Sequence, residues 1–402
     1  MALLKSLEYE LHLLNKLVEC NTDAQSKPEY NKCAEILVQE AKANALTVEI
    51  IDGEKGARDG ISRPNVIATL DTGSDTTLLL ESHFDIVPPG PGWTYPPFKL
   101  TVTEDRAYGR GTSDNKGGIV AAYGALRQLV DEDIDLNISL IASVDEEIGG
   151  QYGVDYVLNH NKPAGEAALV LDAGPERLFI GASGILWGTV RIEGVQGHAG
   201  YPFKADNAID RAMSLLHALQ PYQERVNQKT SQLYAPPNTP HEFIWGRYTV
   251  TMIHAGEKEN IIPGRCEIRF DRRLLPEEDV HDAEQELRDF FEQAKTSVGC
   301  NASLDITTRL PGYLTPSEHP FVQVVKEQIE SLKGHPIRLA GELGGNDGSF
   351  FAKHAIPVVC YGPIRSDTHY HGINEYVYLD DLRLTRDLII NLGKTHARVL
   401  KQ

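Results

Sequence analysis

The sequence predicts an α/β protein with a mostly parallel mixed sheet, interrupted by a smaller α+β domain. Three observations predict this fold: apolar strands alternate with helical patterns in the first part of the chain, alternating strands dominate from about Ser183, and the first pattern returns beyond Leu310. Strands that alternate with helices are typical of parallel sheets covered on both faces. The 402 residues suffice for about two domains. We expect one domain from 1–182 and 298–402, and the other from 183–297.

The first element is expected to be an amphipathic helix that ends near Cys20. Leu7, Leu11, Leu14 and Val18 recur in it at helical spacing, and it lacks the continuous apolar core of a signal peptide. The next expected elements are, in order, a helix at 32–43, strands at 47–51, 65–70 and 77–82, a helix at 117–130, a strand at 137–144, a short helix at 153–160 and a strand at 167–171.

The same periodicities predict the insert and the return to the α/β pattern. The expected elements of the insert are strands at 184–195, 247–254 and 266–272 and helices at 206–219 and 279–295. The elements expected after it are a helix at 318–333, a strand at 336–340, a strand at 356–361 and a final helix at 380–400. The stretch 234–240 is the most loop-like part of the chain.

The composition is typical of a globular protein without a nucleic-acid or membrane partner. Hydrophobic residues make up 41% and charged residues 24% of the chain, and no apolar run approaches the roughly 18 residues of a membrane span. The formal net charge of -18 disfavours phosphate-backbone binding, which relies on Lys and Arg. The five Cys are scattered and form no Cys-x-x-Cys pair. We therefore expect the protein to be located in the reducing cytoplasm.

Polar side chains that can bind metal gather where the expected strands end. An apolar strand ends directly before His83 and Asp85, before Asp145, Glu146 and Glu147, and before Asp172. Ligands of open α/β sheets bind at the carboxyl ends of the strands. Asp114, in a glycine-rich turn, and His371, in the loop before the last helix, add further donors. Imidazole with carboxylate is the ligand set of zinc or, with more oxygen, of manganese or cobalt, so the sequence predicts a metal site there.

Each of these residues also has an ordinary structural interpretation. Asp114 suits a helix N-cap, Asp172 suits a turn, and adjacent acids are common in solvated loops. His371 fits an exposed loop as well, and His369 competes with it as a ligand. The metal interpretation depends on the conjunction, because every structural interpretation would have to hold independently.

Six sequence blocks resemble blocks of the M20 metallopeptidases and occur in the same order as in that family. This family includes succinyl-diaminopimelate desuccinylase, acetylornithine deacetylase, aminoacylase, glutamate carboxypeptidase and several dipeptidases. The blocks are Ser82-His-Phe-Asp-Ile-Val-Pro88, Tyr108-Gly-Arg-Gly-Thr-Ser-Asp-Asn-Lys-Gly-Gly118, Asp145-Glu-Glu147, Gly194-Val-Gln-Gly-His-Ala-Gly-Tyr-Pro202, Asn260-Ile-Ile-Pro-Gly264 and His371-Gly-Ile-Asn-Glu375. The resemblance covers nearly the whole chain. It implies a zinc-exopeptidase-like catalytic domain interrupted by a ferredoxin-like lid or dimerisation domain.

The resemblance implies a co-catalytic pair of divalent metal ions, zinc first, with cobalt or manganese as alternatives. The ligands it implies are His83, Asp114 and Asp172 for one ion, and Glu147, Asp114 and His371 for the other, with Asp114 bridging. Glu146 would be the general base that activates a water molecule. Asp85 would hold the ring of His83 through its free nitrogen, and the peptide bond after Asp114 would be cis.

The resemblance also implies residues that bind the substrate. His198 would donate a hydrogen bond to the developing oxyanion, reaching across from the insert of a partner subunit, and Asn260 would assist it. Arg273 would bind a substrate carboxylate through its planar fork, with Arg272 as a rival one position away. The segment 344–350 resembles a loop of the desuccinylases, and its candidate residues are Gly345, Asn346 and Asp347. Asp347 could alternatively be a surface turn residue.

Together these features favour an enzyme that hydrolyses amide bonds and forms a homodimer through the insert. Its substrate would be a small molecule, either an N-acyl amino acid that loses its acyl group or a short peptide with a free carboxylate. Asp172 favours an alternative, a dipeptidase or aminopeptidase, because deacylases and carboxypeptidases of the family usually carry Glu there. A ligand-binding relative without activity is a third interpretation, although every expected ligand and base position is filled.

Overall fold

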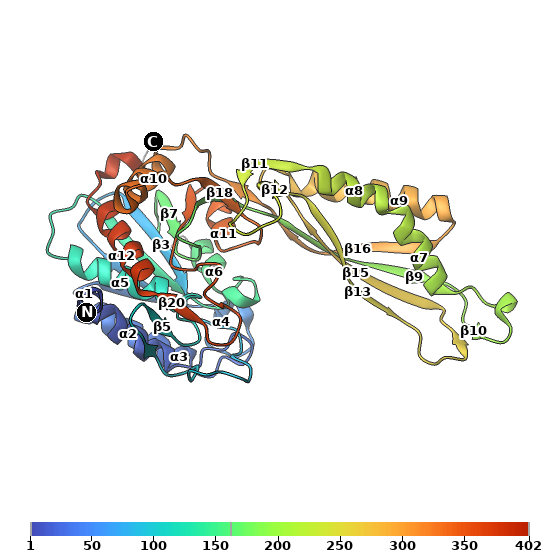
Figure 1. Cartoon of the computed structure of the whole chain (residues 1–402), viewed down its shortest axis with the longest axis horizontal. Coiled ribbons are helices and arrows are strands. Elements are labelled where there is room, and N and C mark those ends of the chain that lie inside the picture. Colours follow the sequence, from blue (N-terminus) through green and yellow to red (C-terminus); the bar gives the residue numbers. More distant parts are fainter. Residues whose placement is uncertain (1, 161–162, 401–402) are drawn as a thin grey trace. The chain divides into compact units, whose positions relative to one another are not determined.

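The chain folds into two compact units, and each is described by itself. The computed structural model describes residues 2–160 and 163–400. The first unit comprises Met1–Ile180, Thr315–Ala340 and Asn346–Gln402, and the second comprises Gly181–Leu314 and Gly341–Gly345 (Figure 1).

The second unit extends beyond 297, where the sequence placed the end of the insert. Strand β16 (Asn301–Leu310) pairs antiparallel with β9 (Ile185–Glu193), and its residues Ala302 and Ile306 are buried in the core of that unit. The alternating pattern of β16 is local, whereas its partner strand is chosen by packing. No strand was expected at 301–310, and a local pattern does not indicate which unit such a strand joins.

The first unit is built on a mixed sheet whose central strands are parallel. These are β6 (Asn137–Ser143), β3 (Thr77–His83), β7 (Ala167–Val170) and β19 (Val358–Cys360). At one edge, β2 (Pro64–Leu70) pairs antiparallel with β6, and β1 (Thr47–Asp52) pairs antiparallel with β2. Parallel strands that are covered on both faces have nearly continuous apolar sequences. Accordingly, β3 and β7 are buried along nearly their whole length. The α/β fold with a mostly parallel sheet, predicted from the sequence, is confirmed.

Helices flank this sheet or pack on the helices that do. They are α1 (Ala2–Ser6), α2 (Glu8–Val18), α3 (Tyr30–Ala43), α5 (Lys116–Leu129), α6 (Val154–Asn159), α10 (Pro320–Lys333) and α12 (Leu379–Gly393). Helix α5 is buried nearly all round because it packs against β3 and also against α2 and α12. The expected first helix is divided at Leu7, and the last one ends at Gly393, a residue that disfavours helix, before a short 3-10 turn at Ala397–Leu400.

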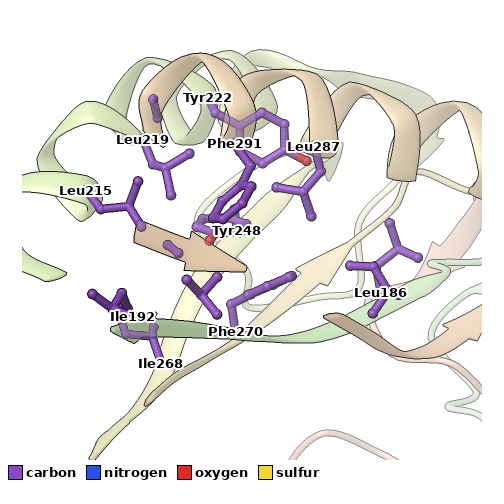
Figure 2. Close-up of a cluster of buried hydrophobic side chains, with 14 of the residues drawn as sticks. Leu186, Ile192, Leu215, Leu219, Tyr222, Tyr248, Ile268, Phe270, Leu287 and Phe291 are labelled. Atoms are coloured by element: carbon purple, nitrogen blue, oxygen red, sulfur yellow. The ribbon is translucent and has the colours of Figure 1, made fainter. Parts of the chain in front are cut away.

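The second unit contains an antiparallel sheet in the order β13 (Arg247–Ala255), β15 (Arg265–Arg273), β9 and β16. Helices α7 (Ala208–Ala218), α8 (Gln220–Gln228) and α9 (Val280–Val298) cover one face of it. Figure 2 shows the core between them, where Tyr222 from α8 and Phe291 from α9 point toward Tyr248 and Phe270 of the sheet. The ring centroids of Tyr222 and Tyr248 lie 5.3 Å apart.

Shorter elements complete the two units. They are α4 (Glu54–Ala57), β4 (Thr101–Val102), β5 (Arg106–Tyr108), η1 (Glu146–Ile148), β8 (Leu178–Ala182), β10 (Gly197–His198), η2 (Pro202–Lys204), β11 (Thr230–Tyr234), β12 (Phe243–Trp245), β14 (Ile261–Ile262), β17 (Tyr313–Leu314), β18 (Leu339–Glu342), α11 (Gly348–Lys353) and β20 (Tyr376–Tyr378). The expected loop at 234–240 leads from β11 into β12, which pair antiparallel. Among the described residues, no helix is long and apolar enough to cross a membrane.

Candidate metal centre

Three neighbouring parallel strands of the first unit end at the same edge of the sheet. In the strand register His83 at the end of β3 lies opposite Ser143 of β6, and Glu81 lies opposite Val170 of β7. The residues that follow β6 and β7 are therefore brought beside His83, as expected for carboxyl strand ends. This register is what gathers the acidic loop and Asp172 around one histidine.

The gathered side chains form two groups, each able to hold a metal ion. One potential ligand atom from each member of the His83 cluster (His83, Glu146, Asp172) lies within 4.8 Å of the others, and the same holds for the His371 cluster (Asp114, Glu147, His371). The resemblance implies that Glu146 is a base rather than a ligand, and the structure places it in the His83 cluster. His369 belongs to neither cluster in the described part of the chain, and its ring packs against that of Tyr376 instead.

Asp114 joins the two clusters. Its Oδ1 lies 3.0 Å from Nε2 of His83, and its Oδ2 lies 3.1 Å from Nε2 of His371. The N-cap interpretation of Asp114 is wrong, because α5 begins after Asn115 and the Asp114 carboxylate is turned toward the two histidines. Its carboxylate thus contacts one imidazole of each cluster.

The electrostatics of the two clusters fit bound cations. Burial raises the pKa of Asp172 to about 7, and Asp114 acts in the same direction. Burial also raises the pKa values of Glu146 and Glu147. For Asp114, burial acts upward, but hydrogen bonds with His371 and His83 hold its pKa below the usual range. Divalent cations would offset the repulsion among these carboxylates, and nitrogen with oxygen donors suits zinc, cobalt or manganese.

Asp85 is fully buried behind the His83 cluster. Its Oδ1 lies 3.4 Å from Nδ1 of His83, and its backbone oxygen lies 3.1 Å from the same nitrogen. Its carboxylate also accepts the backbone N–H groups of Glu146, at 3.3 Å, and Glu147, at 3.1 Å. Asp85 therefore contacts the histidine and also holds the backbone of the acidic loop, a contact that the sequence did not indicate.

Asp145, the first residue of the acidic run, anchors the loop to the rest of the first unit. It is buried and has a positive φ of 62°, a conformation that Asp tolerates better than most residues. Its carboxylate pairs with Arg63 at 2.7 Å and Lys27 at 3.3 Å, and it accepts a hydrogen bond from Tyr30 at 2.9 Å. The solvated-loop interpretation is therefore wrong for this residue.

Glu375 holds the glycine-rich turn that carries Asp114, and sequence reasoning assigned it no role. Its buried carboxylate accepts hydrogen bonds from Arg110 at 2.6 Å and from the backbone N–H groups of Gly111 at 3.0 Å, Ser113 at 2.9 Å and Asp114 at 3.1 Å. The Asp114–Asn115 peptide bond is cis, as expected. A signal was present in the chain, because a turn rich in glycine leaves backbone N–H groups that need an acceptor.

We expect Glu375→Ala to lower the free energy of unfolding by about 3–5 kcal/mol, because it leaves the Arg110 guanidinium buried without its charge partner. Urea unfolding followed by circular dichroism measures the change. The matched control is Glu132→Ala, which breaks an exposed ion pair with Lys394 and should cost less than about 1 kcal/mol. Equal stability of the two variants would show that Glu375 does not support the turn.

The second unit holds the other polar candidates. His198 is exposed on the two-stranded ribbon of β10 and β14, where it lies opposite Ile261. Its Nδ1 accepts the N–H of Gly200 at 3.0 Å, which in the neutral ring leaves Nε2 as the donor. The backbone oxygen of Asn260 accepts the N–H of Ala199 at 3.0 Å, so both candidates belong to one ribbon.

The two neighbouring arginines at the end of β15 have different environments. Arg272 is fully buried, and its Nη2 donates to both carboxylate oxygens of Glu278, at 2.9 and 3.0 Å. Arg273 lies on the other face of the strand, and its Nε donates to Asp271 at 2.9 Å. Arg272 is thus committed to a buried ion pair, whereas Arg273 keeps its terminal nitrogens available.

The candidate residues in segment 344–350 are divided between the units. Gly345 belongs to the second unit, while Asn346 and Asp347 belong to the first. Asp347 is buried, which rules out the surface-turn interpretation, and burial together with the charge of Glu81 raises its pKa. Its Oδ2 has no hydrogen-bond partner among the residues that the structure describes.

Sequence comparisons identify relatives along most of the chain. The succinyl-diaminopimelate desuccinylase of Sulfurovum sp. (strain NBC37-1) is 28% identical over 301 residues. The match covers 73% of this chain and 77% of that protein. The protein of the same name from Hydrogenovibrio crunogenus is 30% identical over 333 residues, which are 78% of this chain and 83% of that protein. The profile of peptidase family M20/M25/M40 matches residues 79–392, well over half of the chain.

Solved structures share the fold over nearly the whole chain. Aminopeptidase PepT from Bacillus cereus has a TM-score of 0.77 at 20% identity, with coverage of 98% of this chain and 99% of that one. Human carnosine dipeptidase 1 has a TM-score of 0.73 at 17% identity, with 98% and 99% covered. The YXEP protein of Bacillus subtilis, described as a dinuclear metal binding peptidase, has a TM-score of 0.69 at 16% identity, with 98% and 99% covered. The resemblance found in the six sequence blocks is confirmed: the chain belongs to peptidase family M20/M25/M40, and it is a metal-dependent hydrolase of amide or peptide bonds.

Proposed function

We propose that this protein is a co-catalytic dinuclear zinc hydrolase that removes the acyl group from N-acyl amino acids. The observation that carries the proposal is the position of Asp114, whose two carboxylate oxygens contact one histidine of each cluster. A carboxylate in that position suits two ions held side by side. Cobalt and manganese accept the same donor set and remain alternatives to zinc.

The residues divide into ligands and a base. The ligands of one ion would be His83, Asp114 and Asp172, and those of the other Glu147, Asp114 and His371. Two such ions, when bound, supply positive charge that makes water more acidic and polarises the substrate carbonyl. Glu146 would accept a proton from the attacking water and pass it to the leaving amine nitrogen. Asp85 would keep the His83 ring in the orientation that this arrangement requires.

The second unit would supply the remaining contacts. We infer that the protein forms a homodimer through this unit and that Nε2 of His198, with Asn260, donates a hydrogen bond to the oxyanion of a partner's site. Arg273 would bind the free carboxylate of the substrate. Gly345, Asn346 and Asp347 would contact the substrate from segment 344–350.

The choice of acyl group over peptide is supported by relatives named succinyl-diaminopimelate desuccinylase. Asp172 supports a second candidate, a dipeptidase or aminopeptidase. The test is a panel of acetyl-amino acids, succinyl-amino acids and dipeptides, each assayed with zinc, cobalt and manganese. Hydrolysis of the acyl-amino acids is expected. Release of amino acids from dipeptides alone would establish the second candidate, and hydrolysis of neither class would overturn both.

Arg273→Gln and Arg272→Gln are expected to affect different properties, substrate binding in the first and stability in the second. Loss of Arg273 should raise KM for a carboxylate substrate by about tenfold or more, because a charged hydrogen bond to the substrate is lost, while stability stays near that of the wild type. Loss of Arg272 should lower the free energy of unfolding by about 1.5–3 kcal/mol, because its buried charged hydrogen bonds to Glu278 are lost while Lys229 still pairs with that carboxylate at 2.7 Å. Steady-state kinetics and urea unfolding measure the two effects. A KM change confined to Arg272→Gln would assign the carboxylate site to the rival position.

A further inference from the structure

Two arginines lie directly opposite each other on neighbouring strands of the sheet in the second unit. Arg247 begins β13, Arg273 ends β15, and the two are direct partners in the antiparallel register. Side chains of directly opposite residues point to the same face of a sheet, where like charges repel. The adjacent pair, Tyr248 and Arg272, points into the core beneath the helices. The two arginines therefore lie on the face that the helices do not cover.

The Arg247 side chain is held in place by neutral groups. Its Nη2 donates to the Ser183 hydroxyl at 3.1 Å and to the Leu343 carbonyl at 2.7 Å, and its guanidinium packs over the Trp245 ring, 5.1 Å from the centroid. Within the described residues, its buried Nη1 has no hydrogen-bond partner. Burial, and then the charge of Arg273, lower the pKa of Arg247 to about 10, so the guanidinium still carries its charge at neutral pH.

The charge around this pair does not balance. Arg273 donates through Nε to Asp271 at 2.9 Å, and Asp271 also accepts the Trp187 indole N–H at 2.6 Å. The residues that the structure describes give the terminal nitrogens of Arg273 no hydrogen-bond acceptor. Two guanidinium groups beside one carboxylate leave about one positive charge on a partly buried surface, and an unpaired charge there is costly unless an anion meets it.

We propose that Arg247 and Arg273 together bind one carboxylate group of the substrate, which makes Arg247 a second specificity-determining residue. The inference rests on the proposed function for the part played by Arg273, and it adds a residue that the sequence did not single out. A planar carboxylate accepts from two guanidinium groups at once, and the net charge of the pair matches one such group. Leu343, which holds Arg247, stands two positions before Gly345 in the segment proposed to contact the substrate.

The test measures binding of succinate to the metal-loaded protein by isothermal titration calorimetry at fixed ionic strength. We expect Arg247→Gln to weaken succinate binding by about tenfold or more, and Arg247→Lys, which keeps the charge but not the fork, to weaken it less. Urea unfolding confirms that each variant is folded. Arg269→Gln is the matched control, because Arg269 is exposed on the same strand and pairs only with Glu267 in the described chain; it should bind succinate as the wild type does.

Two further readings separate this inference from the proposed function. Neutral succinamide should bind the wild type and Arg247→Gln equally weakly, because it offers no charge. In kinetics, Arg247→Gln should raise KM for a carboxylate substrate and leave kcat near the wild-type value. Unchanged succinate affinity in both Arg247 variants would overturn the inference even if the enzyme were active. A loss of succinate affinity in a protein that hydrolyses no substrate of the panel would support the anion site and overturn the proposed function alone.

Discussion

Glu146→Gln is expected to reduce turnover by about a thousandfold or more, because a positioned general base contributes about 10²–10⁴-fold to such reactions. The amide keeps the shape of the side chain but cannot accept the proton. Bound metal should stay at the wild-type level, since the proposed ligands are intact. Steady-state kinetics with an acyl-amino acid and elemental analysis of the same preparation measure the two quantities together.

Glu147→Gln provides the matched control for this prediction. Glu147 follows Glu146 directly, and its carboxylate lies 3.1 Å from Nε2 of His371, so its loss should lower both metal content and turnover. Because Glu146 shares the His83 cluster with two proposed ligands, the contrast is decisive. If Glu146→Gln released metal, Glu146 would be a ligand, and if the variant kept its turnover, the base would be another group.

Asp114→Ala is expected to release both metal ions and abolish turnover. Among the described residues of the two clusters, Asp114 is the one whose carboxylate contacts a histidine in each cluster. The two distances are 3.0 Å to His83 and 3.1 Å to His371. Removing it would leave each ion with fewer protein ligands than a stable site needs. Elemental analysis after dialysis gives the metal content, and circular dichroism shows that the variant is folded.

The control for Asp114→Ala is Asp380→Ala, which removes an exposed carboxylate paired with Arg383 on α12. It should keep full metal content and turnover, because exposed ion pairs contribute little. Retention of one tightly bound ion by Asp114→Ala would contradict the bridging role and would assign Asp114 to a single cluster.

Most long strands and helices could be predicted from the sequence because their patterns are local, whereas the 10-residue strand β16 was not expected. The apolar run before His83 forms β3 within one residue of the expected bounds, and α9 begins at its Asp279 cap and ends before Gly299. The same patterns placed His83, Asp172 and the acidic loop at strand ends. Residue types at strand ends thus indicated a metal centre before any contact was known.

Features that depend on distant contacts were not accessible in this way. Glu375 contacts Gly111 across 264 positions of sequence. The glycine-rich turn indicates that an acceptor is needed, but not which residue supplies it. Asp145 looks like its acidic neighbours in sequence, yet it pairs with Arg63 instead of facing the clusters. Strand β16 alternates like any amphipathic strand, and only its pairing with β9 assigns it to the second unit.

The sequence by itself determined the fold class and the family and indicated the candidate metal-binding residues, because periodicity, strand ends and short blocks are properties of neighbouring residues. Tertiary structure alone decided that Asp114 contacts both histidines, that Arg272 is committed to Glu278, and that Arg247 lies opposite Arg273. The physical reason is that strand register and burial select contacts between residues far apart in the chain, and these contacts fix which charges are paired and which remain available for a ligand.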